Sequence, residues 1–310
     1  MGRPSSHLAG AALFLVCATI ATSFLFDFSA CANVSPAASP APTPPPIPNT
    51  TETNPWSHVT KPTLDPTQSI GEYAAGCLRG AKKIELTGPG YQVMRPSRKR
   101  YYGHPLLINF LKDLAQKVQE KGWGDLLIGD MGQARGGPTV GGHASHQIGL
   151  DVDIWFVQET DGKILTTKQR EELSAPSMVI DDFEGLNEKN WKPQKMDLIK
   201  LAALHPGVQR IFVNPVIKRE LCGKYKGEAW MTKVRPWWFH QEHFHVRLYC
   251  APGDVTCVPQ DETPPGDGCD QTLSDWFTPE SKQKEKELRE TPGQAMLPTL
   301  PALCSEVLKE

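Results

Sequence analysis

The sequence has almost no excess of charge of either sign. Its 33 lysines and arginines and 35 acidic residues leave a formal net charge of −2 at neutral pH. Proteins that bind nucleic acid through its phosphates carry a clustered basic excess. The composition therefore argues against nucleic acid as a partner.

Long apolar runs are missing everywhere except near the N-terminus. Residues 9–26 are largely apolar, Arg3 supplies a basic start, and small residues occupy positions 30–32. These features predict a secretory signal peptide over residues 1–32, with no tight membrane insertion once it is removed. Two alternatives stay open: a retained membrane anchor, and a lipoprotein in which Cys31 is lipidated.

A proline-rich stretch follows the leader. Residues 34–50 contain seven prolines in seventeen positions, and most of the others are Ser, Ala or Thr. Such a composition cannot bury a core and favours an extended chain. We predict a tether over residues 33–55.

The cysteines lack the Cys-x2-Cys spacing that is typical of thiol-bound zinc. Cys17 and Cys31 fall in the leader, which leaves an even set of six. In an exported chain this number predicts three disulfides, although six cysteines allow fifteen pairings. The set consists of Cys77, Cys222, Cys250, Cys257, Cys269 and Cys304.

Residues 56–304 are long enough for one large domain with a buried core. Apolar residues at helical spacing predict a helix over residues 105–122, and a second is expected over 196–204. Short strands are expected over 126–128 and 211–213. The charged segment 281–290 is expected to be solvated, with Cys304 tying the C-terminal region back. Helices around a small antiparallel sheet make an α+β fold, and we find no internal repeat.

Histidines concentrate in two short clusters beside strand-like patterns. Five of the nine fall there: His143, His146, His240, His243 and His245. Apolar residues alternate with polar ones in residues 149–156 and again in 243–249, as expected of strands with one buried face. The alternation places Asp151 and Asp153 together, and His243 and His245 together, on the faces that point away from the core.

His146, Asp153 and one histidine of the His243-x-His245 pair form the donor set of a catalytic zinc site. Two imidazoles and one carboxylate leave a position for water. Residues two apart on a strand lie about 6.5 Å apart, so one imidazole of the pair can ligate while the other meets the water. We assign His245 to zinc and His243 to proton transfer. Asp151 is expected to orient a ligand, and calcium is disfavoured because no oxygen-rich loop is present.

The glycine-rich residues 132–142 precede His146, which places this histidine on a loop over the following strand. Glycine permits positive φ and close backbone approach there. The stretch lacks the Gly-Lys-Ser/Thr ending of a nucleotide-binding loop. A metal site therefore explains the loop better than a nucleotide site does.

These residues closely resemble the penicillin-insensitive murein endopeptidases, within the wider group of lysostaphin-type and D-Ala-D-Ala-carboxypeptidase-type zinc peptidases. The likeness runs from about residue 56 to 304. It is carried by residues 129–132 (GDMG), 141–153 (GGHASHQIGLDVD), 211–215 (IFVNP), 233–237 (KVRPW) and 243–248 (HFHVRL).

The resemblance implies a role for each histidine. His146, Asp153 and His245 would hold Zn²⁺, and His243 would be the base or transition-state stabiliser. His143 would be an additional ligand and His240 a polar neighbour of the metal, although simple lining of the cleft explains these two equally well. Relatives with a second metal use an acid and a histidine in the following loop; residues 178–185 have the acids but no histidine, which argues against a second zinc.

The resemblance also implies the disulfide pairing, which spacing alone leaves open. The implied pairs are Cys77 with Cys304, Cys222 with Cys269, and Cys250 with Cys257. The first pair would join the two ends of the domain.

The expected activity is hydrolysis of the D-alanyl-meso-diaminopimelyl cross-link of periplasmic peptidoglycan by zinc-activated water. No acyl-enzyme forms on such a route, so penicillin should not inhibit it. Arg95, Arg135 and Arg247 are candidates for binding substrate carboxylates. Two other functions stay open: a D-Ala-D-Ala carboxypeptidase of the same group, and a non-catalytic wall-binding accessory protein.

Overall fold

The computed structural model describes residues 50, 52–141, 144–159, 161–180, 185–290 and 296–310. All of them lie in one compact unit, Pro45–Glu310. The expected signal peptide, Cys31 and most of the expected tether lie outside the described residues, as do His143 and residues 181–184. Asn54 is already buried and its side-chain amide donates to the Pro138 carbonyl at 2.8 Å, so packing begins before Trp56.

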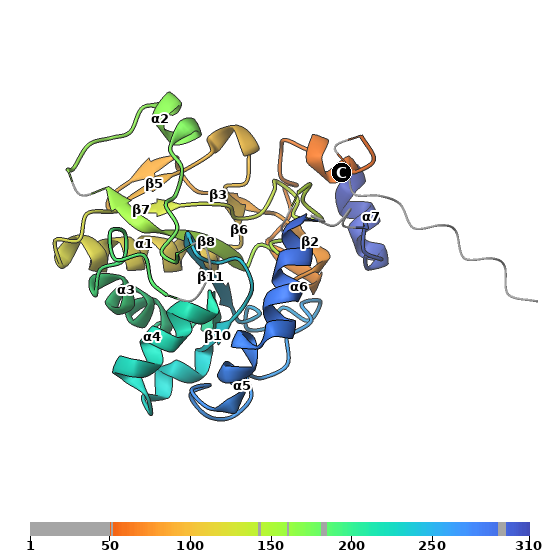
Figure 1. The fold of residues 1–310 in the computed structure, drawn as a ribbon. Helices are drawn as coiled ribbons and strands as arrows, with labels where there is room; N and C mark the ends of the chain where they lie inside the picture. Colours follow the sequence, from red (N-terminus) through yellow and green to blue (C-terminus); the bar gives the residue numbers. More distant parts are fainter. Residues whose placement is uncertain (1–49, 51, 142–143, 160, 181–184, 291–295) are drawn as a thin grey trace, which may run out of the picture. The chain divides into compact units, whose positions relative to one another are not determined.

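Among the described residues, six strands precede the first α-helix and three α-helices follow the last strand (Figure 1). The α-helices are α1 (Pro105–Glu120), α2 (Thr167–Glu172), α3 (Gln194–Ala203), α4 (Pro215–Tyr225), α5 (Gln271–Ser274), α6 (Pro279–Glu290) and α7 (Ala302–Lys309). The strands are β1 (Gln68–Glu72), β2 (Ala75–Arg79), β3 (Lys82–Lys83), β4 (Thr87–Gly88), β5 (Tyr91–Val93), β6 (Tyr102–Gly103), β7 (Asp125–Ile128), β8 (Asp151–Glu159), β9 (Val208–Val213), β10 (Val234–Pro236) and β11 (His243–Leu248). Short 3₁₀ turns occupy Pro55–His58, Pro96–Arg98, Ala229–Lys233 and Asp275–Phe277.

The central sheet has seven strands in the order β10-β9-β11-β8-β7-β5-β4. Its middle strands β9, β11, β8 and β7 pair antiparallel, while β10 with β9 and β5 with β7 pair parallel. Two further pairs, β1-β2 and β3-β6, stand apart from it. The expected α+β fold is confirmed, and strands β8 and β11, which carry Asp153 and His245, lie in the antiparallel middle of a mixed sheet.

Register places the polar residues of three neighbouring strands in rows. In one row, His245 of β11 lies between Asp153 of β8 and Phe212 of β9. In the next, Arg247 lies between Asp151 and Arg210. Because side chains two apart on a strand share a face, the two rows form one polar patch on the sheet.

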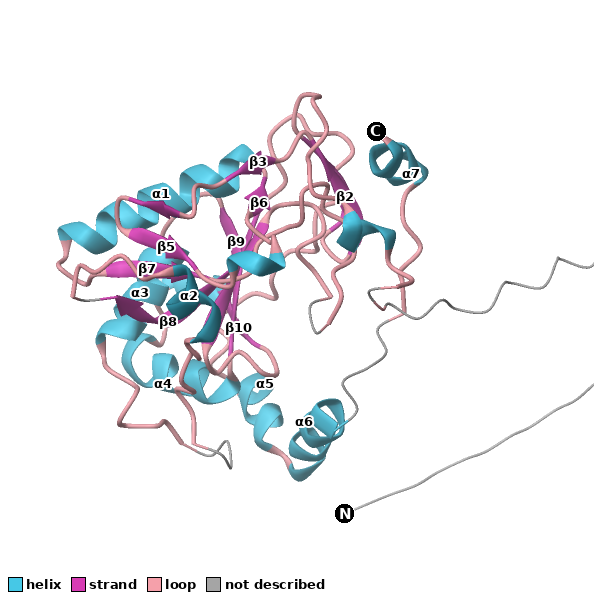
Figure 2. Cartoon of the chain, turned by 90° about the horizontal axis from the view of Figure 1, so that it is seen from above, coloured by secondary structure: helices cyan, strands magenta, loops and turns pink. Residues whose placement is uncertain are grey.

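The other face of these strands is apolar and covered by helices. Val152 and Ile154 of β8 and Phe244 and Val246 of β11 are fully buried in the main core cluster. Helices α1, α3 and α4 contact β7, β9 and β10 respectively (Figure 2). Because this face is buried, the side chains on the opposite face of β8 and β11 are the ones available for chemistry.

Helix α1 shows why the sequence pattern was informative. The ring nitrogen Nδ1 of His104 accepts the Leu106 N–H at 3.1 Å and caps the first turn, and Pro105 occupies the first helical position, where no N–H is needed. After the last turn, Gly122 adopts φ +69°, the left-handed conformation that ends many helices. The helix therefore ends close to where the spacing predicted.

Three disulfides join Cys77 to Cys304, Cys222 to Cys269, and Cys250 to Cys257. These are the pairs that the family resemblance implied. The first attaches α7 to β2, beside a small buried cluster that includes Trp56 and Val307.

The charged segment at residues 281–290 lies within helix α6, which the sequence reasoning did not assign. Of its side chains Glu285 is buried, and most others are exposed. Within the described part of the chain, none of the helices combines the length and apolar character that crossing a bilayer requires.

We predict unequal contributions from the disulfides. The Cys77–Cys304 bond spans 227 residues and the Cys250–Cys257 bond spans 7. From loop-closure entropy, replacing both cysteines of the long-range pair with serine should lower the free energy of unfolding by about 5 kcal/mol, and of the short-range pair by about 2 kcal/mol. Urea unfolding of the two double variants measures this. Equal losses would contradict the prediction.

Candidate metal centre

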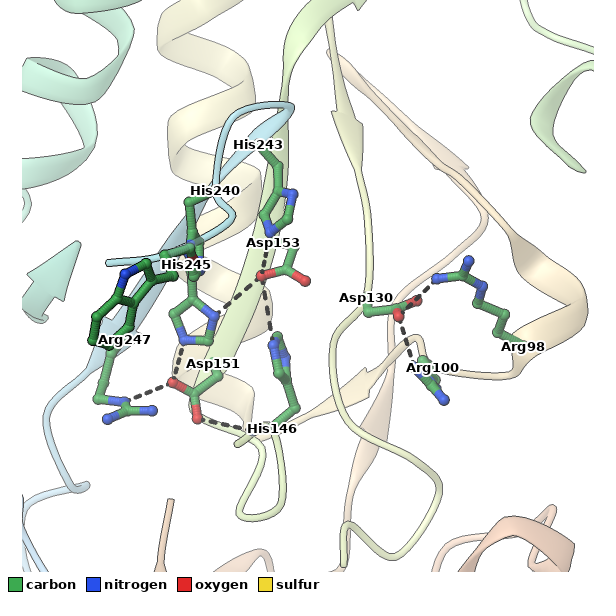
Figure 3. Close-up of polar contacts among 11 residues, drawn as sticks. Arg98, Arg100, Asp130, His146, Asp151, Asp153, His240, His243, His245 and Arg247 are labelled. Atoms are coloured by element: carbon green, nitrogen blue, oxygen red, sulfur yellow. Dashed lines mark hydrogen bonds and ion pairs between the residues drawn. The ribbon is translucent and has the colours of Figure 1, made fainter. Parts of the chain in front are cut away.

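Two imidazoles and a carboxylate meet in the interior, on the polar patch of the sheet (Figure 3). His146 Nε2 lies 3.5 Å from Asp153 Oδ1, and His245 Nδ1 lies 3.1 Å from the same oxygen. All three residues are buried, with at most 4% of their surface exposed. Among the described residues, they are the group whose ligand atoms lie within 4.8 Å of one another.

The three residues of the group come from two neighbouring strands and from the loop that precedes one of them. Asp153 and His245 are cross-strand partners on β8 and β11, so the sheet register alone brings them together. His146 precedes β8 and has φ +69°, a left-handed conformation that is uncommon outside glycine. Such strain concentrates at functional sites.

The glycine-rich loop before His146 is shaped by contact with its own backbone. Gly136 has φ +61°, and a Cβ there would lie 1.9 Å from the Gln147 carbonyl oxygen. Glycine is therefore required for the loop to return against the residue that follows His146.

Asp151 connects the members of the site. Its Oδ1 accepts the Nε2–H of His245 at 2.8 Å and the Nε–H of Arg247 at 2.7 Å. Its Oδ2 accepts the backbone N–H of His146 at 3.3 Å. One fully buried carboxylate thus orients the ring of one histidine and the backbone of the other, as Figure 3 shows.

These contacts determine the charges of the buried groups. Burial by itself raises the pKa of Asp151, but the Arg247 guanidinium and the His245 imidazole outweigh it and hold this pKa below the usual carboxyl value. Burial likewise opposes ionisation of Asp153, yet His243 and His146 keep its pKa well below the usual value. Both carboxylates are therefore anionic at neutral pH.

The donor set fits a small divalent cation. In a tetrahedral zinc site, ligand bonds of about 2.0–2.2 Å place neighbouring donor atoms about 3.3–3.6 Å apart. The separations from Asp153 Oδ1 to His146 Nε2 and to His245 Nδ1, 3.5 and 3.1 Å, are close to this range. In the neutral form of the ring, the bond from His245 Nε2–H to Asp151 leaves Nδ1 with a lone pair on the side of Asp153, as a metal ligand requires.

His243 and His240 lie beside this group. His243 Nε2 lies 3.6 Å from Asp153 Oδ1, and its side chain is 22% exposed, so it stands on the accessible side. The His240 ring centroid is 5.1 Å from that of His243, and His240 Nδ1 donates to the Trp238 carbonyl at 2.7 Å. Burial, together with the neighbouring His243 and His245, lowers the pKa of His240 well below its usual value. His240 is therefore a neutral imidazole with its other nitrogen available as an acceptor.

A cavity of about 330 Å³ opens onto the group. His146, His240 and His245 line it together with the aromatic residues Phe212, Trp237 and Phe239 and the polar residues Arg210, Arg247 and Gln260. A peptide could therefore approach the imidazoles through a space that is partly apolar and partly basic.

Of the three arginines that the sequence suggested for substrate binding, Arg247 lines this cavity. Arg135 donates to the backbone carbonyls of Lys61, Val307 and Leu308, and Arg95 donates to that of Leu173. The sequence reasoning missed Arg210, because it predicted a strand only over residues 211–213. Extending the same alternation backwards would have placed Arg210 and Phe212 on one face.

Comparison with known proteins agrees with this geometry. A family model described as penicillin-insensitive murein endopeptidase matches residues 69–309. The chain belongs to this family. Proteins of that name from Klebsiella pneumoniae subsp. pneumoniae, Shigella boydii and Yersinia enterocolitica are 44%, 43% and 42% identical to it. The alignments cover 83%, 83% and 82% of this chain and 91%, 91% and 90% of the relatives.

The resemblance expected from the sequence is thereby confirmed, and with it membership of a peptidase family. The matched region contains every residue of the buried group, as well as His240, His243 and the arginines of the cavity. The site therefore lies in the part of the chain that its relatives share.

We predict that Asp151 contributes to metal affinity without being a ligand. Asp151→Asn removes the charge that orients His245 and should weaken Zn²⁺ binding by about 10- to 100-fold. Competition with a chromophoric chelator measures the change.

Asp130→Asn is the matched control. Asp130 is also buried and bonded to two arginines, Arg98 at 3.0 Å and Arg100 at 2.8 Å, but it lies apart from the histidines (Figure 3). This variant should lose stability and keep its zinc affinity. Equal affinity losses in both variants would assign the effect to general unfolding.

Proposed function

We propose that this protein is a zinc-dependent endopeptidase that hydrolyses the D-alanyl-meso-diaminopimelyl cross-link of peptidoglycan. The observation that carries the proposal is the buried His146, Asp153 and His245 group, whose two imidazoles line a cavity of about 330 Å³. The names of the relatives support murein as the substrate, and the chemistry of the donor set supports zinc.

His146, Asp153 and His245 would hold the metal. A zinc ion with three protein ligands supplies a Lewis acid and lowers the pKa of water in its open position. Asp151 and Arg247 keep the His245 ring oriented for that task. No serine, cysteine or threonine is needed as a nucleophile on this route, so β-lactams, which acylate a serine, have no target in it.

His243 is the proposed proton carrier. It sits two residues before His245 on β11, on the accessible side of the group. From there it would accept the proton of the attacking water and deliver it to the leaving amine. His240, neutral and packed near the His243 ring, would accept a hydrogen bond that orients the substrate or His243.

The cysteine chemistry supports a periplasmic location. All six cysteines beyond the expected leader are paired in disulfides. Disulfides of this kind persist in oxidising compartments such as the bacterial periplasm. The predicted signal peptide over residues 1–32, or lipidation at Cys31, would bring the chain there.

Purified mature protein should convert cross-linked muropeptide dimers to monomers. Activity should vanish with a chelator, return with Zn²⁺ and be unchanged by penicillin, which chromatography of the muropeptides would show. Release of free D-alanine from uncross-linked stems instead would make the protein a carboxypeptidase. Zinc binding without turnover of either substrate would make it an accessory protein.

Replacing His243 separates metal binding from catalysis. His243→Ala should keep its zinc content and lose about 10²- to 10⁴-fold in kcat if the imidazole is a general base. His58→Ala, at an exposed histidine of the first 3₁₀ turn, is the control and should keep full activity. A retained rate in His243→Ala would move proton transfer to another group, of which His240 is the nearest imidazole.

A further inference from the structure

Two arginines lie directly opposite each other on neighbouring strands beside the metal group. Arg210 of β9 is the cross-strand partner of Arg247 of β11 in an antiparallel pair. Like charges at directly opposed positions destabilise a sheet. The proposed catalytic mechanism gives Arg210 no role. The metal site therefore does not explain why the fold keeps two like charges opposite each other.

The nearby negative charge is the carboxylate of Asp151, which already forms an ion pair with Arg247. On the far side of β11, Asp151 accepts from Arg247 Nε, and Gln260 Oε1 accepts from Arg247 Nη1 at 2.7 Å. Tyr73 and Phe212 flank the Arg247 guanidinium, with ring centroids 4.3 and 5.3 Å from its central carbon. Arg247 is therefore held rigidly, with its charge shared with a carboxylate that also serves His245.

Arg210 has no such carboxylate. Its Nη2 donates to the backbone carbonyl of Asp261 at 2.8 Å, and its Nε is buried without a hydrogen-bond partner among the described residues. No ion pair joins it to an acidic side chain in the described part of the chain. Burial and the neighbouring Arg247 and Arg235 lower the pKa of Arg210, and the acidic residues Glu262 and Asp261 offset this only in part.

Both guanidinium groups line the cavity that His146 and His245 also line. One carboxylate oxygen bridges the Arg247 guanidinium and the His245 ring, because both donate to Asp151 Oδ1. An anion between Arg210 and Arg247 would therefore lie in the same cavity as the reacting bond. It would relieve the repulsion between the two arginines and satisfy the buried N–H of Arg210.

We propose that Arg210, backed by Arg247, binds the carboxylate on the carbon that bears the scissile amide nitrogen. The assignment rests on the proposed function and specifies its substrate. In the cross-link, the diaminopimelyl carbon bonded to that nitrogen carries a free carboxylate, so every cleavable bond presents an anion next to it. In an ordinary internal peptide bond, an uncharged amide stands in place of this carboxylate, so Arg210 and Arg247 would not favour its binding.

The test is a substrate pair that differs only in this group. One muropeptide dimer keeps the free carboxylate and the other carries a carboxamide, which has nearly the same shape without the charge. The measurements are kcat and KM for each substrate, and its binding to the His243→Ala variant by calorimetry. The proteins are the zinc-loaded mature chain, Arg210→Gln, Arg210→Lys and the control Arg95→Gln, which removes the same charge from an arginine bonded to Leu173 outside the cavity.

We expect the wild type to prefer the free carboxylate by about 10- to 100-fold in kcat/KM, because a hydrogen bond to a charged group is worth that factor. In Arg210→Gln the preference should fall to near one, mainly through KM, while zinc content stays unchanged. Arg210→Lys should keep part of the preference, since lysine supplies the positive charge but not the paired N–H donors of a guanidinium. Arg95→Gln should behave as wild type.

An undiminished preference in a folded Arg210→Gln or Arg210→Lys protein would overturn the assignment, as would equal binding of both substrates by His243→Ala. These outcomes leave the proposed activity intact, because turnover continues. If the wild type cleaves neither substrate, the proposed function itself fails and the assignment falls with it.

Discussion

The buried carboxylate of Asp151 holds the polar side of this protein together. It accepts hydrogen bonds from the His245 ring and the Arg247 guanidinium, both on β11, and from the His146 backbone in the loop before β8. Removing a carboxylate from water costs several kcal/mol, and that cost is offset here because one guanidinium and two N–H groups converge on its two oxygens. The same contacts fix the histidine geometry, so the stability of the sheet and the geometry of the candidate metal centre cannot be varied separately.

The polar patch depends in turn on the apolar face behind it. Val152, Ile154, Phe244 and Val246 are buried against the helices, which leaves their neighbours in sequence on the opposite face. A shift of β11 by one residue relative to β8 would move His245 away from Asp153 and turn it toward the core. Register is therefore specified by hydrophobic burial, and the meeting of His245 with Asp153 is a consequence of it.

This dependence explains how much of the molecule could be predicted from the sequence. Alternation in residues 149–156 and 243–249 correctly predicted two strands and the face that carries Asp151, Asp153, His243 and His245. Helix α1 was predictable because Pro105, Gly122 and the apolar spacing agree with one another. What alternation cannot reveal is which strands become neighbours, because pairing joins residues more than ninety positions apart, as in His245 with Asp153. The position of Arg210 opposite Arg247 and the mixed character of the sheet were invisible for that reason. Helix α6 was missed because its charged residues have little apolar face to reveal a period.

The distribution of charge around the cavity follows from the same neighbour relations. Across the row formed by β9, β11 and β8, the fold places Arg210, Arg247 and Asp151 in that order, and the one carboxylate of the row is bonded to Arg247. The adjacent row places Phe212, His245 and Asp153, where the one carboxylate is directed at the imidazoles. Positive charge therefore accumulates toward β9, and the anionic donor for a metal lies toward β8. A bound metal would add positive charge on the β8 side, so an extended substrate that carries a negative group beside its scissile amide would be complementary to both ends of the row. An uncharged segment would leave the positive charge on the β9 side without a partner. A rigid sheet can in this way distinguish a charged substrate from an uncharged one without moving.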